Sequence, residues 1–103
     1  MLSDRPAYAN LDRDLRFVAA NDRLLNIIGK EREEVIGKRY WEIIPEAEGK
    51  ALHMLMLEAE SSMRSLKRRV WSDPLQTWLD VELYPMSDGM QVAFTPVEGP
   101  PPL

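Results

Sequence analysis

Few side chains in this sequence are suited to catalytic chemistry. The chain has one histidine, His53, no cysteine, no glycine-rich phosphate loop and no HExxH zinc pattern, so nucleophile–base pairs and metal sites are hard to assemble. Carboxylates are numerous, but they occur in charged stretches of the kind that normally form a solvated helix face. These carboxylates are Glu31, Glu33, Glu34, Glu58 and Glu60. The sequence predicts that the chain is not an enzyme and holds no metal.

The composition is that of one globular domain. The chain has 103 residues, of which 45% are hydrophobic and 29% are charged, enough for a single modest core. A net charge of −4 argues against a dedicated nucleic-acid binder. No apolar run approaches the roughly 20 residues that cross a bilayer, and the N-terminus lacks the apolar centre of a signal peptide. We therefore expect a soluble, cytoplasmic domain with no membrane insertion and no nucleic-acid partner.

Three short helical segments follow one another between Asn21 and Pro45. The Asn21 side chain can cap the first segment, whose apolar residues end at Gly29. The second segment ends at Gly37, and Pro45 forbids a simple continuation of the third. Helices this short are not stable alone, so they must pack on something larger.

Strand patterns lie on both sides of the helical region. Before it, Ala7–Leu11 and Leu15–Val18 flank a polar turn. Glu46–Met63 is the longest helical pattern, and after it the apolar period changes to two. The later strand candidates are Leu66–Trp71, Trp78–Tyr84 and a last strand that carries Met90, Val92 and Phe94.

These elements predict an α+β fold, in which a five-stranded antiparallel sheet carries the short helices and the longer helix on one face. Residues 1–6 are predicted to be a lead-in, 7–97 the domain and 98–103 a proline-rich linker. In Trp78–Tyr84, Leu79, Val81 and Leu83 share the buried face. The opposite face of that strand carries Trp78, Asp80, Glu82 and Tyr84.

The order and spacing of several motifs resemble those of a PAS domain, a sensory module of signalling proteins. These motifs are Asp12, Phe17–Asn21, Leu25–Gly29, Glu33–Lys38, Trp41–Pro45, Trp78–Pro85 and Asp88-Gly89. The resemblance implies a module that binds a small ligand, a protein partner or both. It would relay the signal to an effector domain in a longer protein of the sensor histidine kinase or diguanylate cyclase type. Phe94–Val97 stands where such domains commonly have an Asp-Ile-Thr-like exit motif.

The resemblance implies a ligand cavity between the long helix and the sheet. Its candidate lining is Ile28, Ile36, Trp41, Ile44, Leu52, Leu55, Met56, Val81, Leu83, Val92 and Phe94. The ligand, if one binds, stays unknown; non-covalent flavin or a small carboxylate or aromatic metabolite would suit. A flavin–cysteinyl adduct is excluded because the chain has no cysteine. The alternative is that these side chains form a plain core, since apolar periodicity marks core more often than pocket.

His53 lies in the long helix, where heme-binding PAS relatives have a histidine ligand to iron, so the resemblance makes it a candidate heme ligand. On a helical wheel it lies about 100° from Leu52, at the margin of the buried stripe. The alternative is a boundary histidine with no ligand.

The aromatic residues Trp71, Trp78 and Tyr84 predict a protein interface on the sheet, because they are mixed with charge. We expect a homodimer through this face. The competing hypothesis is a ligand-free dimerisation module with a full core. Lys67-Arg68-Arg69 is interpreted as a guard against edge-to-edge aggregation.

Overall fold

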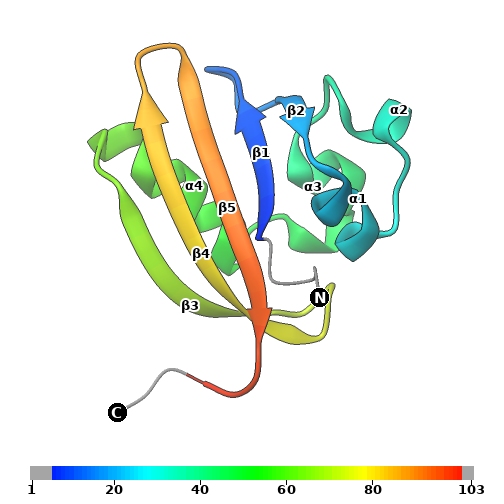
Figure 1. Ribbon diagram of the computed structural model, residues 1–103. Coiled ribbons are helices and arrows are strands. Elements are labelled where there is room, and N and C mark those ends of the chain that lie inside the picture. Colours follow the sequence, from blue (N-terminus) through cyan, green and yellow to red (C-terminus); the bar gives the residue numbers. More distant parts are fainter. Residues whose placement is uncertain (1–5, 101–103) are drawn as a thin grey trace.

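The computed structural model describes residues 6–100 and has the predicted α+β architecture. Its sheet has five strands in the order β2-β1-β5-β4-β3, all antiparallel neighbours (Figure 1). The elements are, in chain order, β1 Ala7–Leu11, β2 Phe17–Ala20, α1 Asp22–Ile28, α2 Arg32–Val35, α3 Tyr40–Ile43, η2 Pro45–Ala47, α4 Ala51–Ser62, β3 Leu66–Ser72, β4 Thr77–Met86 and β5 Gly89–Val97. Most of the predicted lead-in, and residues 101–103 of the predicted linker, lie outside the described residues.

Strand β5 is the central strand of the sheet, because it pairs with β4 on one side and with β1, from the start of the chain, on the other. On one side it pairs with β4, from Trp78 opposite Val97 to Met86 opposite Gly89, across a tight turn at residues 87–88. On the other side it pairs with β1, from Ala7 opposite Phe94 to Leu11 opposite Met90. Pro96 lies beyond the part of β5 that pairs with β1, so its missing N–H leaves that pairing intact.

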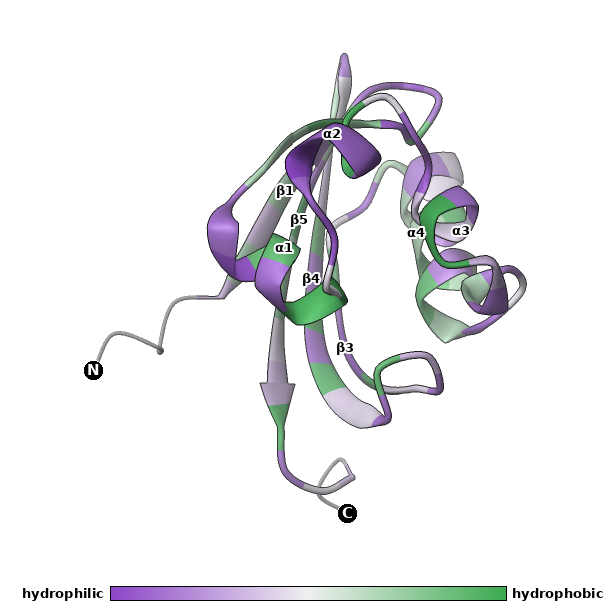
Figure 2. Cartoon of the chain, turned by 90° about the vertical axis from the view of Figure 1, so that its right-hand side faces the viewer, coloured by the Kyte–Doolittle hydropathy of each residue, from purple (hydrophilic) through white to green (hydrophobic). Residues whose placement is uncertain are grey.

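The core lies between one face of the sheet and the helices. Leu79, Val81 and Leu83 of β4 are fully buried, while the residues between them are half-buried, as the alternation predicts. Figure 2 shows α3 and α4 on one side of β3, β4 and β5. The other face of these strands is uncovered by any described helix.

Local hydrogen bonds explain why such short helices form. Asn21 Oδ1 accepts the N–H of Leu24, 3.0 Å away, at the start of α1. In the next two helices the bond runs the other way, from the backbone of the capping residue to a carboxylate in the first turn: Glu34 accepts the N–H of Glu31, and Glu42 accepts the N–H of Arg39. Each satisfies a backbone donor that the helix itself leaves free.

Two predicted boundaries are wrong for identifiable reasons. The second strand starts at Phe17 and not at Leu15, because Asp12 Oδ1 accepts the N–H groups of Asp14 and Arg16 and folds this segment into a turn. Leu15 accordingly has a φ of 65°. The long helix starts at Ala51 and not at residue 46, because Pro45–Ala47 forms a separate 3-10 turn and Gly49 then has a φ of 77°.

Candidate functional site

The residues predicted to line a ligand cavity lie mostly in the continuous core. Buried in one cluster are Ile28, Leu52, Met56, Val81, Leu83, Val92 and Phe94. Trp41, Ile44 and Leu55 are partly buried and pack against that cluster. A cavity remains between α3, the start of α4 and β3, and its volume is about 10 Å³. Pockets that hold drug-sized ligands measure roughly 300–1,000 Å³, so this arrangement is that of a packed interior.

Ile36 lies elsewhere than predicted. It follows the last residue of α2, and its side chain is 38% exposed, whereas the preceding Val35 is fully buried. Adjacent residues on a helix point about 100° apart, so only one of the two apolar side chains can enter the core. Ile36 instead lines an open surface depression between α1 and α2.

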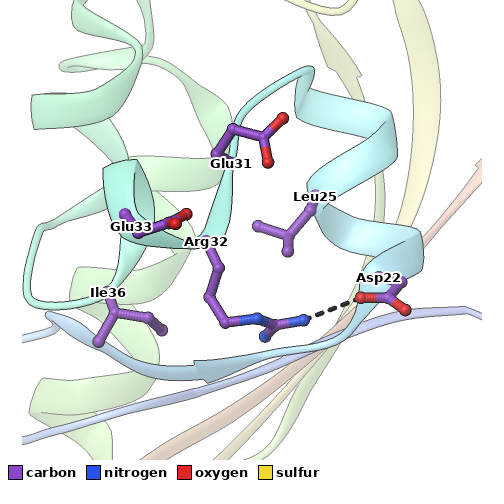
Figure 3. A pocket seen from close by; sticks show the side chains of 6 residues that line it. All are labelled: Asp22, Leu25, Glu31, Arg32, Glu33 and Ile36. Atoms are coloured by element: carbon purple, nitrogen blue, oxygen red, sulfur yellow. Dashed lines mark hydrogen bonds and ion pairs between the residues drawn. The ribbon is translucent and has the colours of Figure 1, made fainter.

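That depression has a volume of about 590 Å³ and is built around Arg32 (Figure 3). The Arg32 guanidinium donates to Asp22 Oδ1 at 2.8 Å and to the carbonyl of Ala20, so it joins α2 to the start of α1. Glu31 and Glu33 stand on the opposite wall. Sequence reasoning missed this feature, because its residues come from two helices whose packing no periodicity predicts. Because the Arg32 guanidinium is already engaged by Asp22 and Ala20, little of its positive charge is available to recognise a ligand.

His53 is held by two neighbours on the solvent side of the core. Its ring stacks on that of Trp41, with centroids 3.8 Å apart and an angle of 15° between the planes. Its Nδ1 accepts the N–H of Gly49 at 2.8 Å, one turn before it on the chain. In the neutral ring, Nε2 then carries the proton. A heme ligand would need Nε2 deprotonated and facing a cavity, and the ring face is already covered by Trp41.

The uncovered side of the sheet, which we call the open face, carries the predicted aromatic residues. Strand register places side chains in rows across it. One row is Trp71, Trp78 and Val97; the next is Arg69, Asp80 and Thr95; the next is Lys67, Glu82, Ala93 and Tyr8. In Figure 1 this face looks toward the viewer, with α4 behind the sheet.

The aromatic row is held in a defined geometry. Trp71 and Trp78 contact edge to face, with centroids 5.7 Å apart and planes at 69°, an arrangement that aromatic quadrupoles favour. The Trp71 indole N–H donates to Asp73 Oδ1 at 2.7 Å in the β3–β4 turn. Trp71 is nevertheless 40% exposed. The row therefore presents ordered apolar surface to solvent.

The charged row beside it is internally paired. Arg69 donates from Nε and Nη2 to the two carboxylate oxygens of Asp80, at 2.6 and 2.9 Å. This fork geometry holds the pKa of the Asp80 carboxyl below its usual range. Sequence reasoning placed Asp80 on this face but missed its partner, because the pairing depends on strand register.

Tyr84 completes the face near the β4–β5 turn. Its hydroxyl donates to Glu82 two residues away, and this hydrogen bond raises the pKa of Tyr84. Across the strand Tyr84 lies opposite Gln91. The structure thus brings Trp71 and Trp78 together and leaves Tyr84 separate, toward the other end of β4.

Within residues 6–100, no three His, Asp or Glu side chains gather closely enough to hold a metal ion. No helix in the same range is long and apolar enough to cross a membrane.

Comparison with known proteins gives a consistent result. A family model described as the PAS fold matches residues 3–95. The PAS domain of histidine kinase ThkA is similar in structure, with a TM-score of 0.75 and 14% identity, covering 88% of this chain and 98% of that one. A sensory box sensor histidine kinase from Vibrio cholerae is similar with a TM-score of 0.73 and 16% identity, covering 92% of this chain and 81% of that one. The PAS domain of BvgS from Bordetella pertussis is similar with a TM-score of 0.64 and 20% identity, covering 92% of this chain and 78% of that one. No curated protein sequence matches significantly.

Proposed function

This chain belongs to the PAS fold family, as its motifs predict, and we propose that it is a sensory module of a longer signalling protein. In this proposal the module acts by pairing its open face with a second copy of the chain. The effector it controls lies in the same longer protein, of the sensor histidine kinase or diguanylate cyclase type. The neighbouring structures from histidine kinases support the first of these types.

The observation that carries the proposal is the row of Trp71, Trp78 and Val97 on the open face. Large aromatic side chains at the centre of an interface supply much of its binding energy. Their edge-to-face contact orders them before association, so less side-chain entropy is lost on binding. The neighbouring Arg69–Asp80 pair is already satisfied within one protomer, so burying it leaves no unpaired charge.

The position of this row suggests how association reaches an effector. Val97 is the last residue of β5, and it pairs with Trp78. The chain leaves the sheet directly after it, below β5 in Figure 1. A change in how two open faces pack would therefore move the residues that lead onward. Such a shift between two packings is a population change that a signal could bias.

A small ligand inside the domain is the second candidate. The cavity beside Tyr40 favours it, because Leu52, one of the residues predicted to line a pocket, also lines this cavity. Its present volume admits nothing larger than a water molecule, so a ligand such as flavin or an aromatic metabolite would have to displace core side chains. Heme ligation through His53 is less favoured, since Nδ1 is engaged by Gly49 and the ring by Trp41.

Native mass spectrometry of the freshly purified protein, with an absorbance spectrum of the same sample, tests the proposal. We expect a dimer at twice the bare chain mass and no visible absorbance. A dimer with added mass would favour the ligand sensor, and a Soret band that His53→Ala removes would establish heme ligation. A monomer at every concentration would contradict pairing through the open face.

A further inference from the structure

The hydroxyl of Tyr40 is a buried polar group without a partner. Tyr40 is the first residue of α3, and its side chain is only 3% exposed. Its oxygen makes no hydrogen bond to any of residues 6–100. Buried hydroxyls are nearly always hydrogen-bonded, to protein or to ordered water. A buried hydroxyl that no protein group engages therefore points to a hydrogen-bond partner other than the protein.

The cavity described above adjoins this hydroxyl. It lies between α3, the start of α4 and the end of β3, and its lining includes Tyr40, Ala51, Leu52, Val70 and Ser72. Its volume of about 10 Å³ is close to the smallest that holds one water molecule. Larger molecules do not fit without movement of the core.

A second hydroxyl lines the same cavity. Ser72 ends β3 and is 8% exposed, which makes it the one buried polar residue in the described chain. Its Oγ accepts the N–H of Leu75 at 3.3 Å. A water needs at least two polar partners to be held in a protein interior, and Tyr40 and Ser72 supply two.

The protonation state of Tyr40 also suits a neutral ligand. Burial raises the pKa of Tyr40 to about 12, while the Ser72 hydroxyl, which lies beside the phenol oxygen without meeting hydrogen-bond geometry, lowers it. The phenol therefore keeps its proton across the physiological range. Lys50, which also lines the cavity, forms an ion pair with Asp73 at 3.5 Å that links the start of α4 to the β3–β4 turn.

We propose that the cavity binds one water molecule, which bridges the hydroxyls of Tyr40 and Ser72 by hydrogen bonds and joins α3 to β3. This inference is independent of the proposed signalling function. It assigns a defined polar site to the contact between α3 and β3.

Substitution of Tyr40 by phenylalanine tests the proposal through the sign of the stability change. If water satisfies the hydroxyl, Tyr40→Phe loses a hydrogen bond, and the folded-to-unfolded ratio in urea titrations falls by a factor of roughly three to ten. If the hydroxyl is a true orphan, its removal leaves the ratio unchanged or raises it, which would overturn the proposal. Tyr8→Phe is the matched control, because Tyr8 is 44% exposed and lies on the open face; we expect no change.

A double-mutant cycle tests whether the two hydroxyls are coupled, and a crystal structure separates a bridging water from a direct contact. Ser72→Ala combined with Tyr40→Phe should cost less than the two single changes together, because both remove the same bridge. Additive effects would argue against a shared water. A crystal structure at about 1.8 Å resolution should show one density peak within hydrogen-bond distance of both oxygens. An empty cavity, or a direct Tyr40–Ser72 hydrogen bond, would refute the assignment.

Discussion

At the residue scale, Asn21 makes more interactions than its capping role alone requires. Besides capping α1, its Oδ1 accepts the N–H of Tyr8 at 3.0 Å, and its Nδ2 donates to the carbonyl of Pro6 at 3.2 Å. One amide thus ties the first helix to the first strand. The sequence motif Phe17–Asn21 revealed the cap, but the second tie spans residues too distant for local patterns to predict.

We expect Asn21→Ala to lower the free energy of unfolding by about 2 kcal/mol, because it removes the cap and leaves the Tyr8 N–H with a weaker partner. Urea titration followed by circular dichroism measures this change. Asn26→Ala, on the exposed side of the same helix, is the control and should change stability by less than about 0.5 kcal/mol. Equal effects of the two substitutions would show that Asn21 has no special role.

The Arg69–Asp80 pair makes the free energy of unfolding depend on pH. Pairing lowers the pKa of Asp80 in the folded state. The contribution of the pair to the free energy of unfolding is therefore fully present above the pKa of an unfolded Asp, about 3.9. This contribution is lost as the pH falls through the lower pKa of the folded state. The advantage of the wild type over Asp80→Asn should therefore be constant between about pH 5 and 7 and should shrink below about pH 4. The advantage is small, since water still reaches both half-buried side chains. Urea titrations at pH 7 and pH 3 test this prediction, and an advantage that persists at pH 3 would contradict it.

At the element scale, the sheet depends on a close approach between the β4–β5 turn and β1. A Cβ atom on Gly89 would lie 1.9 Å from the carbonyl oxygen of Leu11. Both are backbone positions in paired strands, so neither can move without breaking the β1–β5 ladder.

Gly89→Ala should therefore lower the free energy of unfolding by roughly 3 kcal/mol. Gly29→Ala is the matched control: Gly29 has a φ of 71°, but nothing lies within 4 Å of an added Cβ. Only the left-handed backbone then opposes the change, at a cost of about 1 kcal/mol. Thermal and urea unfolding of both variants measure the difference. If Gly89→Ala were no worse than Gly29→Ala, the close approach would not be a constraint on the fold.

Elements proved predictable where local chemistry determines them. Asn21, Gly29 and Pro45 mark helix limits by capping or by backbone restriction, and the alternation in β4 correctly separated Leu79, Val81 and Leu83 from the other face. Predictions failed where a side chain overrode the pattern, as when Asp12 turned the segment at Leu15. Ile36 was misplaced because apolar character does not tell which of two adjacent residues enters the core.

At the scale of the whole molecule, the candidate sites depend on packing that no single segment encodes. The family resemblance indicated interior residues for a cavity, but only the packed helices and sheet show that most of these residues fill the core. The cavity of about 10 Å³ that remains is lined by just one of them, Leu52. Likewise Trp71 and Trp78 were both nominated for an interface, but their contact follows from the register of β3 on β4. Cross-strand register is set by the turn at residues 73–76 and by burial of the opposite face.

Sedimentation velocity across a range of protein concentrations tests the central claim, pairing through the open face, most directly. The wild type should dimerise, and Trp71→Lys, which places a charge in the aromatic row, should weaken the dimer by at least tenfold. Met54→Lys is the control, because Met54 is 53% exposed on α4, behind the sheet; it should dimerise like the wild type. Circular dichroism confirms that both variants fold. A Trp71→Lys protein that dimerises as strongly as the wild type would contradict the account.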